Sequence, residues 1–370
     1  MGVAHSSSIW CESDNHHLYE KHSSFNMWLD EKGESDDTIA KYGLAVIGTP
    51  SKALFAGDYP AYLEAVLSFS QRRLHSALGK TAFEEHWFNR NLAHFEELLD
   101  ALKSKSVVPF IGAGVSCSSG YSSWKAHLIA QGKTAGLGDI GPLLDSGQYE
   151  EVMQQVLRLP HGRNLFIDNL KVDFLKRPSQ LELQTMVLAL CPHVVITTNY
   201  DRCLELAAAQ RGEGEVEPIY AYSADTQPLI ASLSHRRRAI LKLHGDIKSA
   251  SECILSSDQY DAAYGTGYID MDRPLPRKLR RVYESNSLLF IGCSLHFDRT
   301  LQVFQKVMDE RGASDIPPHF AIIEAPTDAS DLVRRNKSLS DVGIIPIFYP
   351  SGEHFKLKEI LSCVKDELTH

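Results

Sequence analysis

Short apolar runs alternate with amphipathic stretches along most of this chain. Six runs are rich in β-branched or aromatic residues and are short enough to be buried strands. They cover residues 107–111, 194–196, 239–243, 288–291, 320–323 and 344–349. Apolar residues at helical spacing separate most of them. Strands that alternate with helices predict an α/β fold with a doubly wound, Rossmann-like parallel sheet.

Three regions outside these runs have a helical pattern. Residues 60–105 place apolar side chains on one helix face, residues about 134–190 do so between the first two strands, and a last amphipathic stretch follows residue 349. Residues 1–40 are polar, so we expect them to be loosely ordered or ordered only against a partner. The pattern predicts a mainly helical N-terminal region, 1–90, and a second domain, 91–370, with a helical insertion.

Composition narrows the class of protein. A hydrophobic fraction of 43% over 370 residues is that of a globular protein, and no run approaches the ~20 apolar residues of a membrane span. The polar start lacks the order of a signal peptide, which predicts a cytoplasmic location without membrane attachment. The net charge of −9 argues against nucleic-acid binding over the whole surface. The seven cysteines are scattered without a CxxC pair, so neither a disulfide framework nor a sequence-local zinc site is indicated.

A glycine-rich loop ends the first strand. Gly112, Ala113 and Gly114 stop the apolar run and leave no large side chain in the way of a ligand. If a helix starts between Ser116 and Trp124, its free N–H groups would face a bound diphosphate. The third glycine of the full dinucleotide pattern is absent, so the loop is either a phosphate cradle or an ordinary strand-to-helix turn.

Polar residues also follow the other strands. Thr198, Asn199 and Asp201 come after the second run, at the sheet edge where ligands bind in open parallel sheets. Asn199 and Asp201 are candidate site residues, helix caps, or both. His244 follows the third run and is either a structural histidine or a general base titrating near neutrality.

The later strand ends repeat this arrangement. The fourth run ends in Gly292 and Ser294, which again combine a glycine with a hydroxyl group. The fifth ends in Glu324, whose carboxylate either hydrogen-bonds a ribose diol or belongs to a solvated loop. These repeated strand ends predict one ligand site rather than separate turns.

Four motifs in this order resemble the sirtuin family, most closely its bacterial NAD-hydrolysing branch of antiphage defence. They are 112–116, 197–201, 242–245 and 292–295, and the resemblance covers roughly residues 90–370. It implies an NAD+ pocket, with NAD+ as substrate. By this resemblance His244 is the catalytic histidine, Asn199 positions water or the ribose, and Asp201 lies beside them. The remaining implied NAD-binding residues are Gly112, Ala113, Gly114, Ser116, Thr198, Gly292, Ser294 and Glu324.

The chain departs from the protein deacylases of that family. Their zinc module of two CxxC pairs is absent, because only Cys253, Cys293 and Cys363 follow the histidine. We therefore expect no zinc, and water rather than an acyl oxygen as the attacking group. The products would be nicotinamide and ADP-ribose, or a cyclised form if an internal nucleophile attacks first, and NAD+ would be depleted in abortive infection.

The resemblance also implies partners. An NAD+ hydrolase must be held inactive, so we expect a homo-oligomer, a HerA-type hexameric ATPase or another phage-sensing partner, with nucleic acid bound only through that partner. A non-catalytic NAD or ADP-ribose sensor or scaffold is the alternative function. A deacylase or ADP-ribosyltransferase fits less well, for the zinc reason above.

Overall fold

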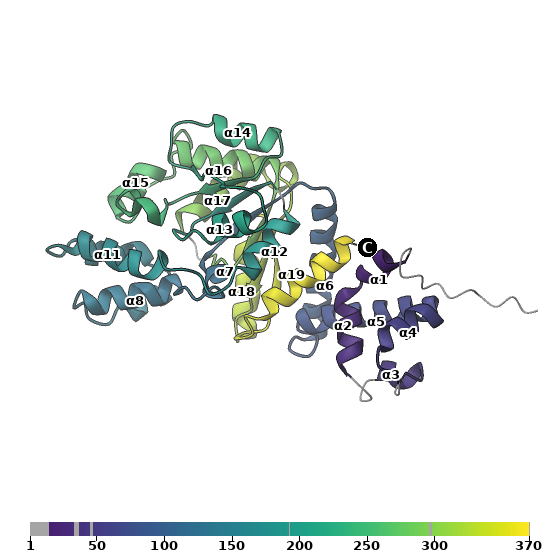
Figure 1. The fold of residues 1–370 in the computed structure, drawn as a ribbon. Helices are drawn as coiled ribbons and strands as arrows, with labels where there is room; N and C mark the ends of the chain where they lie inside the picture. The colour runs from purple at the N-terminus through teal and green to yellow at the C-terminus, as the bar shows by residue number, and fades with distance from the viewer. Residues whose placement is uncertain (1–14, 33–36, 45–46, 192, 296–297, 370) are drawn as a thin grey trace, which may run out of the picture. The chain divides into compact units, whose positions relative to one another are not determined.

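The computed structural model describes residues 15–32, 37–44, 47–191, 193–295 and 298–369. The chain forms two compact units (Figure 1). One contains residues 1–92 together with 355–370, and the other contains residues 93–354. The boundary at residue 92 falls within the long helix α6.

The described part of the first unit contains helices and no strand, which confirms the mainly helical character expected of the N-terminal region. Its helices are α1 (His16–Glu20), α2 (Ser23–Lys32), α3 (Asp37–Lys41), α4 (Pro50–Gly57), α5 (Tyr59–Ala77), the start of α6 (Glu85–Lys103) and α19 (Lys356–Thr369). Helices α1, α2 and α3 lie in the polar segment for which little order was expected. Residues 1–14 and 33–36 of that segment lie outside the described residues.

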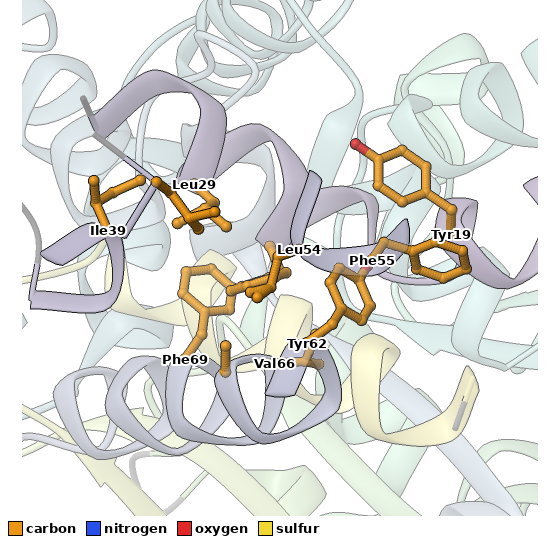
Figure 2. Packing of buried hydrophobic residues seen from close by; sticks show 11 residues of the cluster. Tyr19, Leu29, Ile39, Leu54, Phe55, Tyr62, Val66 and Phe69 are labelled. Carbon is orange, nitrogen blue, oxygen red and sulfur yellow. The ribbon is translucent and has the colours of Figure 1, made fainter. Parts of the chain in front are cut away.

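An aromatic cluster explains why so polar a segment is ordered. Tyr19, Phe25 and Leu29 of the first two helices are buried in one cluster with Phe55 and Tyr62 (Figure 2). The Tyr19 and Phe55 rings meet edge to face with centroids 5.5 Å apart, a favoured aromatic arrangement. Four apolar residues of the segment, Tyr19, Phe25, Leu29 and Ile39, are therefore buried in one core, and average composition does not reveal this.

The C-terminal helix belongs to the same unit. Arg73 of α5 donates to Asp366 Oδ2 at 2.7 Å and to Ser362 Oγ at 2.8 Å, both on α19. The predicted division at residue 90 placed these C-terminal residues in the second domain, whereas residues 355–370 belong to the first unit.

The second unit contains a seven-stranded parallel sheet of order β3-β4-β2-β1-β5-β6-β7, which confirms the predicted fold class. The strands are β1 (Val107–Ile111), β2 (Val194–Thr197), β3 (Ile219–Tyr220), β4 (Ala239–Lys242), β5 (Ser287–Ile291), β6 (His319–Glu324) and β7 (Ile344–Tyr349). Six of them match the six apolar runs. The edge strand β3 was missed because two half-buried residues give no periodic signal.

The chain winds in both directions from β1. It passes first to β2, β3 and β4 on one side, and then to β5, β6 and β7 on the other. Right-handed crossovers place the connecting helices of these two halves on opposite faces of the sheet. The winding direction therefore reverses between β1 and β5, and the carboxyl ends of these strands border a crevice where ligands bind in such sheets.

Helices fill the connections between the strands (Figure 1). A short helix, α7 (Ala113–Cys117), starts directly after β1, earlier than the predicted 116–124. The next helices are α8 (Trp124–Thr134), α9 (Gly141–Asp145), α10 (Tyr149–Leu157), α11 (Gly162–Phe174) and α12 (Glu182–Leu190), which agrees with the expected helical insertion. The later helices are α13 (Cys203–Gln210), α14 (Gln227–Ser234), η2 (Ile247–Glu252), α15 (Ser257–Tyr264), α16 (Pro274–Ser285), α17 (Arg299–Arg311), η3 (Ala313–Asp315) and α18 (Ala329–Ser340). Within the described ranges, no helix is both long and apolar enough to cross a membrane.

The loops after β1 and β5 touch backbone to backbone. The Gly112 N–H donates to the Ile291 carbonyl at 3.0 Å, and the Gly114 N–H donates to the Gly292 carbonyl at 2.9 Å. A Cβ on Gly112 would lie 2.4 Å from the Gly292 oxygen. Gly292 also has φ +66°, in the left-handed region that favours glycine. These glycines are therefore required by packing within the fold, whatever ligand they bind.

We predict that Gly112→Ala lowers the free energy of unfolding by about 2–4 kcal/mol, because the new methyl group must displace backbone. Gly138→Ala is the matched control, since a Cβ at Gly138 meets nothing within 4 Å. Urea denaturation of both variants tests this. Equal stability of the two variants would show that the two loops separate easily.

Candidate active site

One large cavity lies at the carboxyl edge of the sheet. Its volume is about 1590 Å³, larger than the roughly 300–1,000 Å³ of most small-molecule pockets. All eleven residues expected at the site line this cavity: Gly112, Ala113, Gly114, Ser116, Thr198, Asn199, Asp201, His244, Gly292, Ser294 and Glu324. The structure thus brings together side chains from five strand ends, while their individual roles stay predictions.

The glycine loop offers fewer free donors than its sequence suggests. The N–H groups of Gly112 and Gly114 are bonded to the β5 loop, and that of Val115 donates to the Gly112 carbonyl at 3.2 Å. In the described part of the chain, the Ala113 N–H has no such partner. The loop therefore offers a glycine surface and one free N–H group, at the start of a single-turn helix.

Ser116 joins the loops that follow β1 and β2. Its hydroxyl donates to Asp201 Oδ2 at 2.8 Å and accepts from Asn199 Nδ2 at 3.0 Å. The Asp201 Oδ1 atom accepts from the Cys203 N–H at 2.9 Å and so shapes the start of α13. Asp201 is therefore both a local turn residue and a cavity residue, the combination that the sequence left open.

The amide of Asn199 has a fixed orientation. Its Nδ2 donates to the Gly112 carbonyl at 3.1 Å, and a carbonyl oxygen can only accept, so nitrogen must face it. No residue in the described ranges bonds the remaining Oδ1 atom. Because Asn199 lines the cavity, this oxygen is available to accept a hydrogen bond from a ligand hydroxyl or from water.

His244 follows the end of β4 and is only 8% exposed. Burial lowers its pKa to about 4, so the imidazole is neutral at physiological pH. Its Nε2 lies 2.8 Å from the hydroxyl of Tyr264, which sequence reasoning did not select. A neutral imidazole that reaches a ligand cavity is able to accept a proton.

A buried ion cluster lies behind the loops of Asn199 and His244. Lys242 is fully buried, and its Nζ lies 3.0 Å from Glu205 Oε1 and 2.9 Å from Asp246 Oδ2. The same ammonium donates to the carbonyl of Asp201 at 2.6 Å. The Lys242 ammonium favours the ionised form of the Glu205 carboxyl. Burial acts in the opposite direction and raises the pKa of Glu205. Lys242 thus ties the loop after β2 to the loop after β4.

A second ionic group lies on the cavity wall and was missed from the sequence. Arg299, the first residue of α17, bonds Glu150 of α10 at 2.9 Å, Asp261 of α15 at 2.7 Å and the Gly265 carbonyl at 3.0 Å. It connects the helical insertion to two helices that follow β4 and β5. No short motif marks this residue, because its partners are 149 and 38 residues away.

The other end of the cavity contains Glu324. Its Oε1 accepts from the Gly352 N–H at 2.7 Å and from the Ser351 hydroxyl at 3.1 Å. Arg335 donates to the carbonyls of Ser294 and Leu295 and so holds the loop after β5. The Glu324 carboxylate keeps one oxygen, Oε2, outside these hydrogen bonds and is a candidate partner for a hydroxyl pair.

In the part of the chain that the structure describes, no group of three or more His, Cys, Asp or Glu side chains is arranged to hold a metal ion. The absence of zinc stays a prediction.

Part of the chain is similar to known proteins. Residues 193–347 match the family model described as a SIR2-like domain. The chain is 32% identical over 201 residues to the NAD(+) hydrolase ThsA of Cytobacillus dafuensis. This alignment covers 54% of the present chain and 37% of the relative. The chain is 32% identical over 188 residues to the ThsA of Bacillus cereus, covering 50% and 36%. The chain is also 28% identical over 217 residues to Defense-associated sirtuin 2 of Bacillus subtilis. This alignment covers 54% of the present chain and 19% of the relative.

These matches are partial on both sides. The chain spans well under half of the length of these relatives. The family match begins at residue 193, so it includes Asn199, His244 and Gly292 but not the glycine loop after β1.

We predict that the free energy of unfolding falls in mild acid, because two histidines are buried in the folded state. Burial lowers the pKa of His244 to about 4 and of His319 to about 3, whereas the unfolded chain binds a proton near pH 6.5. Below pH 6.5 the unfolded state therefore takes up protons that the folded state does not bind. Each histidine lowers the unfolding free energy by up to about 1.4 kcal/mol per pH unit. Urea denaturation between pH 7.5 and 5 measures the slope, which should become shallower in His319→Asn; an unchanged slope would contradict the assignment.

We predict that Lys242→Met destabilises the protein by about 3–5 kcal/mol, because Glu205 and Asp246 lose the cation at 3.0 and 2.9 Å and keep only Arg202, at 3.8 and 3.7 Å. Lys278→Met is the matched control. Lys278 is equally buried, but its Nζ contacts only backbone carbonyls, so its removal strands no charge.

Denaturation curves compare the two lysine variants, together with a variant in which Lys242→Met is combined with Glu205→Gln and Asp246→Asn. Neutralising the carboxylates should restore part of the stability. A Lys242→Met variant no less stable than the control would rule out the proposed charge pairing.

Proposed function

We propose that this chain is a sirtuin-like NAD+ hydrolase of antiphage defence, which cleaves the nicotinamide–ribose bond to give nicotinamide and ADP-ribose. The observation that carries the proposal is the convergence of a glycine cradle, Asn199 and His244 in one cavity at the reversal point of a parallel sheet. The names of the partial relatives support the same activity.

The residues present fit a dinucleotide. The cavity extends from Glu324 to His244 and is large enough for an extended ligand. Gly112 and Gly114 line the cavity, and the Ala113 N–H would donate to a diphosphate there. The Oε2 atom of Glu324, which lies 3.8 Å from His354 Nδ1, would accept from the adenosine ribose diol. At the other end, Oδ1 of Asn199 would accept from water or from the nicotinamide ribose.

The chemistry of the bond matches these groups. Nicotinamide in NAD+ is a cationic leaving group, so its departure requires little acid assistance and leaves an oxocarbenium-like ribose. Asp201, a carboxylate at the cavity wall, would stabilise the developing positive charge. Asn199 would hold water in place, and neutral His244 would accept the proton that the water loses.

The proposal includes control by assembly. Continuous hydrolysis of NAD+ would kill the cell that makes the enzyme, so activity must be restricted until infection. A homo-oligomer, a HerA-type ATPase or another phage-sensing partner would supply that control. The resemblance supports this part of the proposal.

The experiment incubates the purified full chain with NAD+, with and without a co-purified partner, and follows nicotinamide and ADP-ribose by chromatography and mass spectrometry. We expect both products from the wild type under at least one of these conditions. His244→Ala should lower kcat at least about 100-fold, because a positioned base contributes roughly 10²–10⁴-fold. Calorimetry should show that the variant still binds NAD+.

The matched control is His235→Ala, which removes an exposed histidine remote from the cavity lining. It should keep wild-type turnover. Tight NAD+ binding without product in either condition would contradict hydrolysis and favour a sensor or scaffold role.

A further inference from the structure

A chain of buried hydroxyl groups lies behind His244. The Tyr264 hydroxyl is 2.8 Å from His244 Nε2 and 3.2 Å from Thr300 Oγ1. Tyr264 is the last residue of α15 and is completely buried, and Thr300 lies in the first turn of α17 with 5% exposure. The loop after β4, helix α15 and helix α17 thus contribute to one hydrogen-bonded chain.

In the described part of the chain, the other ring nitrogen of His244 is without a protein partner. Within the described ranges no group bonds Nδ1, although His244 itself lines the cavity. Nε2 is occupied by Tyr264, so Nδ1 is the nitrogen left to exchange a proton with a ligand or water. For Nδ1 to accept that proton, the neutral ring must carry its hydrogen on Nε2.

The direction of the hydrogen bonds decides whether this is so. Burial raises the pKa of Tyr264 well above its usual value, so the phenol keeps its single hydrogen at all working pH values. If that hydrogen points to Thr300, the phenol oxygen accepts from Nε2–H and leaves Nδ1 free. If it points to His244, Nε2 must accept it, and the single hydrogen of the neutral ring then lies on Nδ1. A protonated Nδ1 cannot act as a base.

We propose that Tyr264, with its hydrogen donated to Thr300, is a positioning residue that holds His244 in the tautomer with a free Nδ1 facing the cavity. This inference rests on the proposed hydrolase function for its catalytic consequence. When Nδ1 removes a proton from water, the ring becomes an imidazolium and its Nε2–H already has an acceptor. No group has to reorient during the reaction, which is the advantage of a preorganised site.

The activity test uses Tyr264→Phe, which keeps the ring and removes only the hydroxyl. We expect kcat to fall about 10- to 100-fold, part of the full contribution of a general base, with KM changing less than about threefold. Thr300→Val should lower kcat in the same sense but less. Tyr283→Phe is the control, because it removes another buried tyrosine hydroxyl, bonded to the Val342 carbonyl away from the cavity. Its kcat should equal that of the wild type.

A second readout separates positioning from general stability and does not need turnover. Two-bond ¹H–¹⁵N NMR spectra of the full chain, labelled with ¹⁵N-histidine, report which ring nitrogen carries hydrogen. The His244 signals are assigned by their absence from His244→Ala. We expect Nε2–H in the wild type and in Tyr283→Phe, and a loss of that single tautomer in Tyr264→Phe.

The two proposals fail in different ways. A wild type that releases no nicotinamide would overturn the proposed function, and the spectra would still report the tautomer. A wild-type ring with hydrogen on Nδ1, or a Tyr264→Phe variant with an unchanged tautomer and unchanged kcat, would overturn the role of Tyr264.

Discussion

Backbone contact between the loops after β1 and β5 is the constraint on which the second unit depends. The Gly114 N–H reaches the Gly292 carbonyl at 2.9 Å, and a Cβ on either Gly112 or Gly292 would meet backbone. This contact brings the two halves of the sheet together where the winding reverses. The cavity opens beside it, so the same glycines define both the fold and the surface that would contact a diphosphate.

Polar side chains then arrange the chemistry around this contact. Ser116 bonds both Asn199 and Asp201, and Lys242 joins the Asp201 carbonyl to Asp246 in the loop of His244. None of the candidate reactive groups is held by its own strand alone. A site built in this way is sensitive to substitutions that do not touch the ligand, and charge pairing behind the cavity matters as much as the residues that line it.

The sequence predicted the sheet well because the strands and their polar ends depend on short-range patterns. Apolar runs ending in glycine or polar residues mark the carboxyl edge of a parallel sheet, and that edge gathered all eleven candidate residues. Edge strand β3 was too short to give a pattern. Arg299 and Tyr264 could not be found, because their partners lie far away in the sequence and only folding places them together. The helices of the polar N-terminal segment were missed because a few buried aromatic side chains are enough to order it, and its average composition is polar.

The most direct test of the account is a crystal structure of the His244→Ala variant with NAD+ bound. We expect the diphosphate to lie against Gly112 and Ala113, and the nicotinamide ribose to lie within hydrogen-bond distance of Asn199 Oδ1. We also expect an adenosine ribose beside Glu324. NAD+ bound away from the β1 and β5 loops, or with its nicotinamide ribose remote from Asn199, would contradict the account.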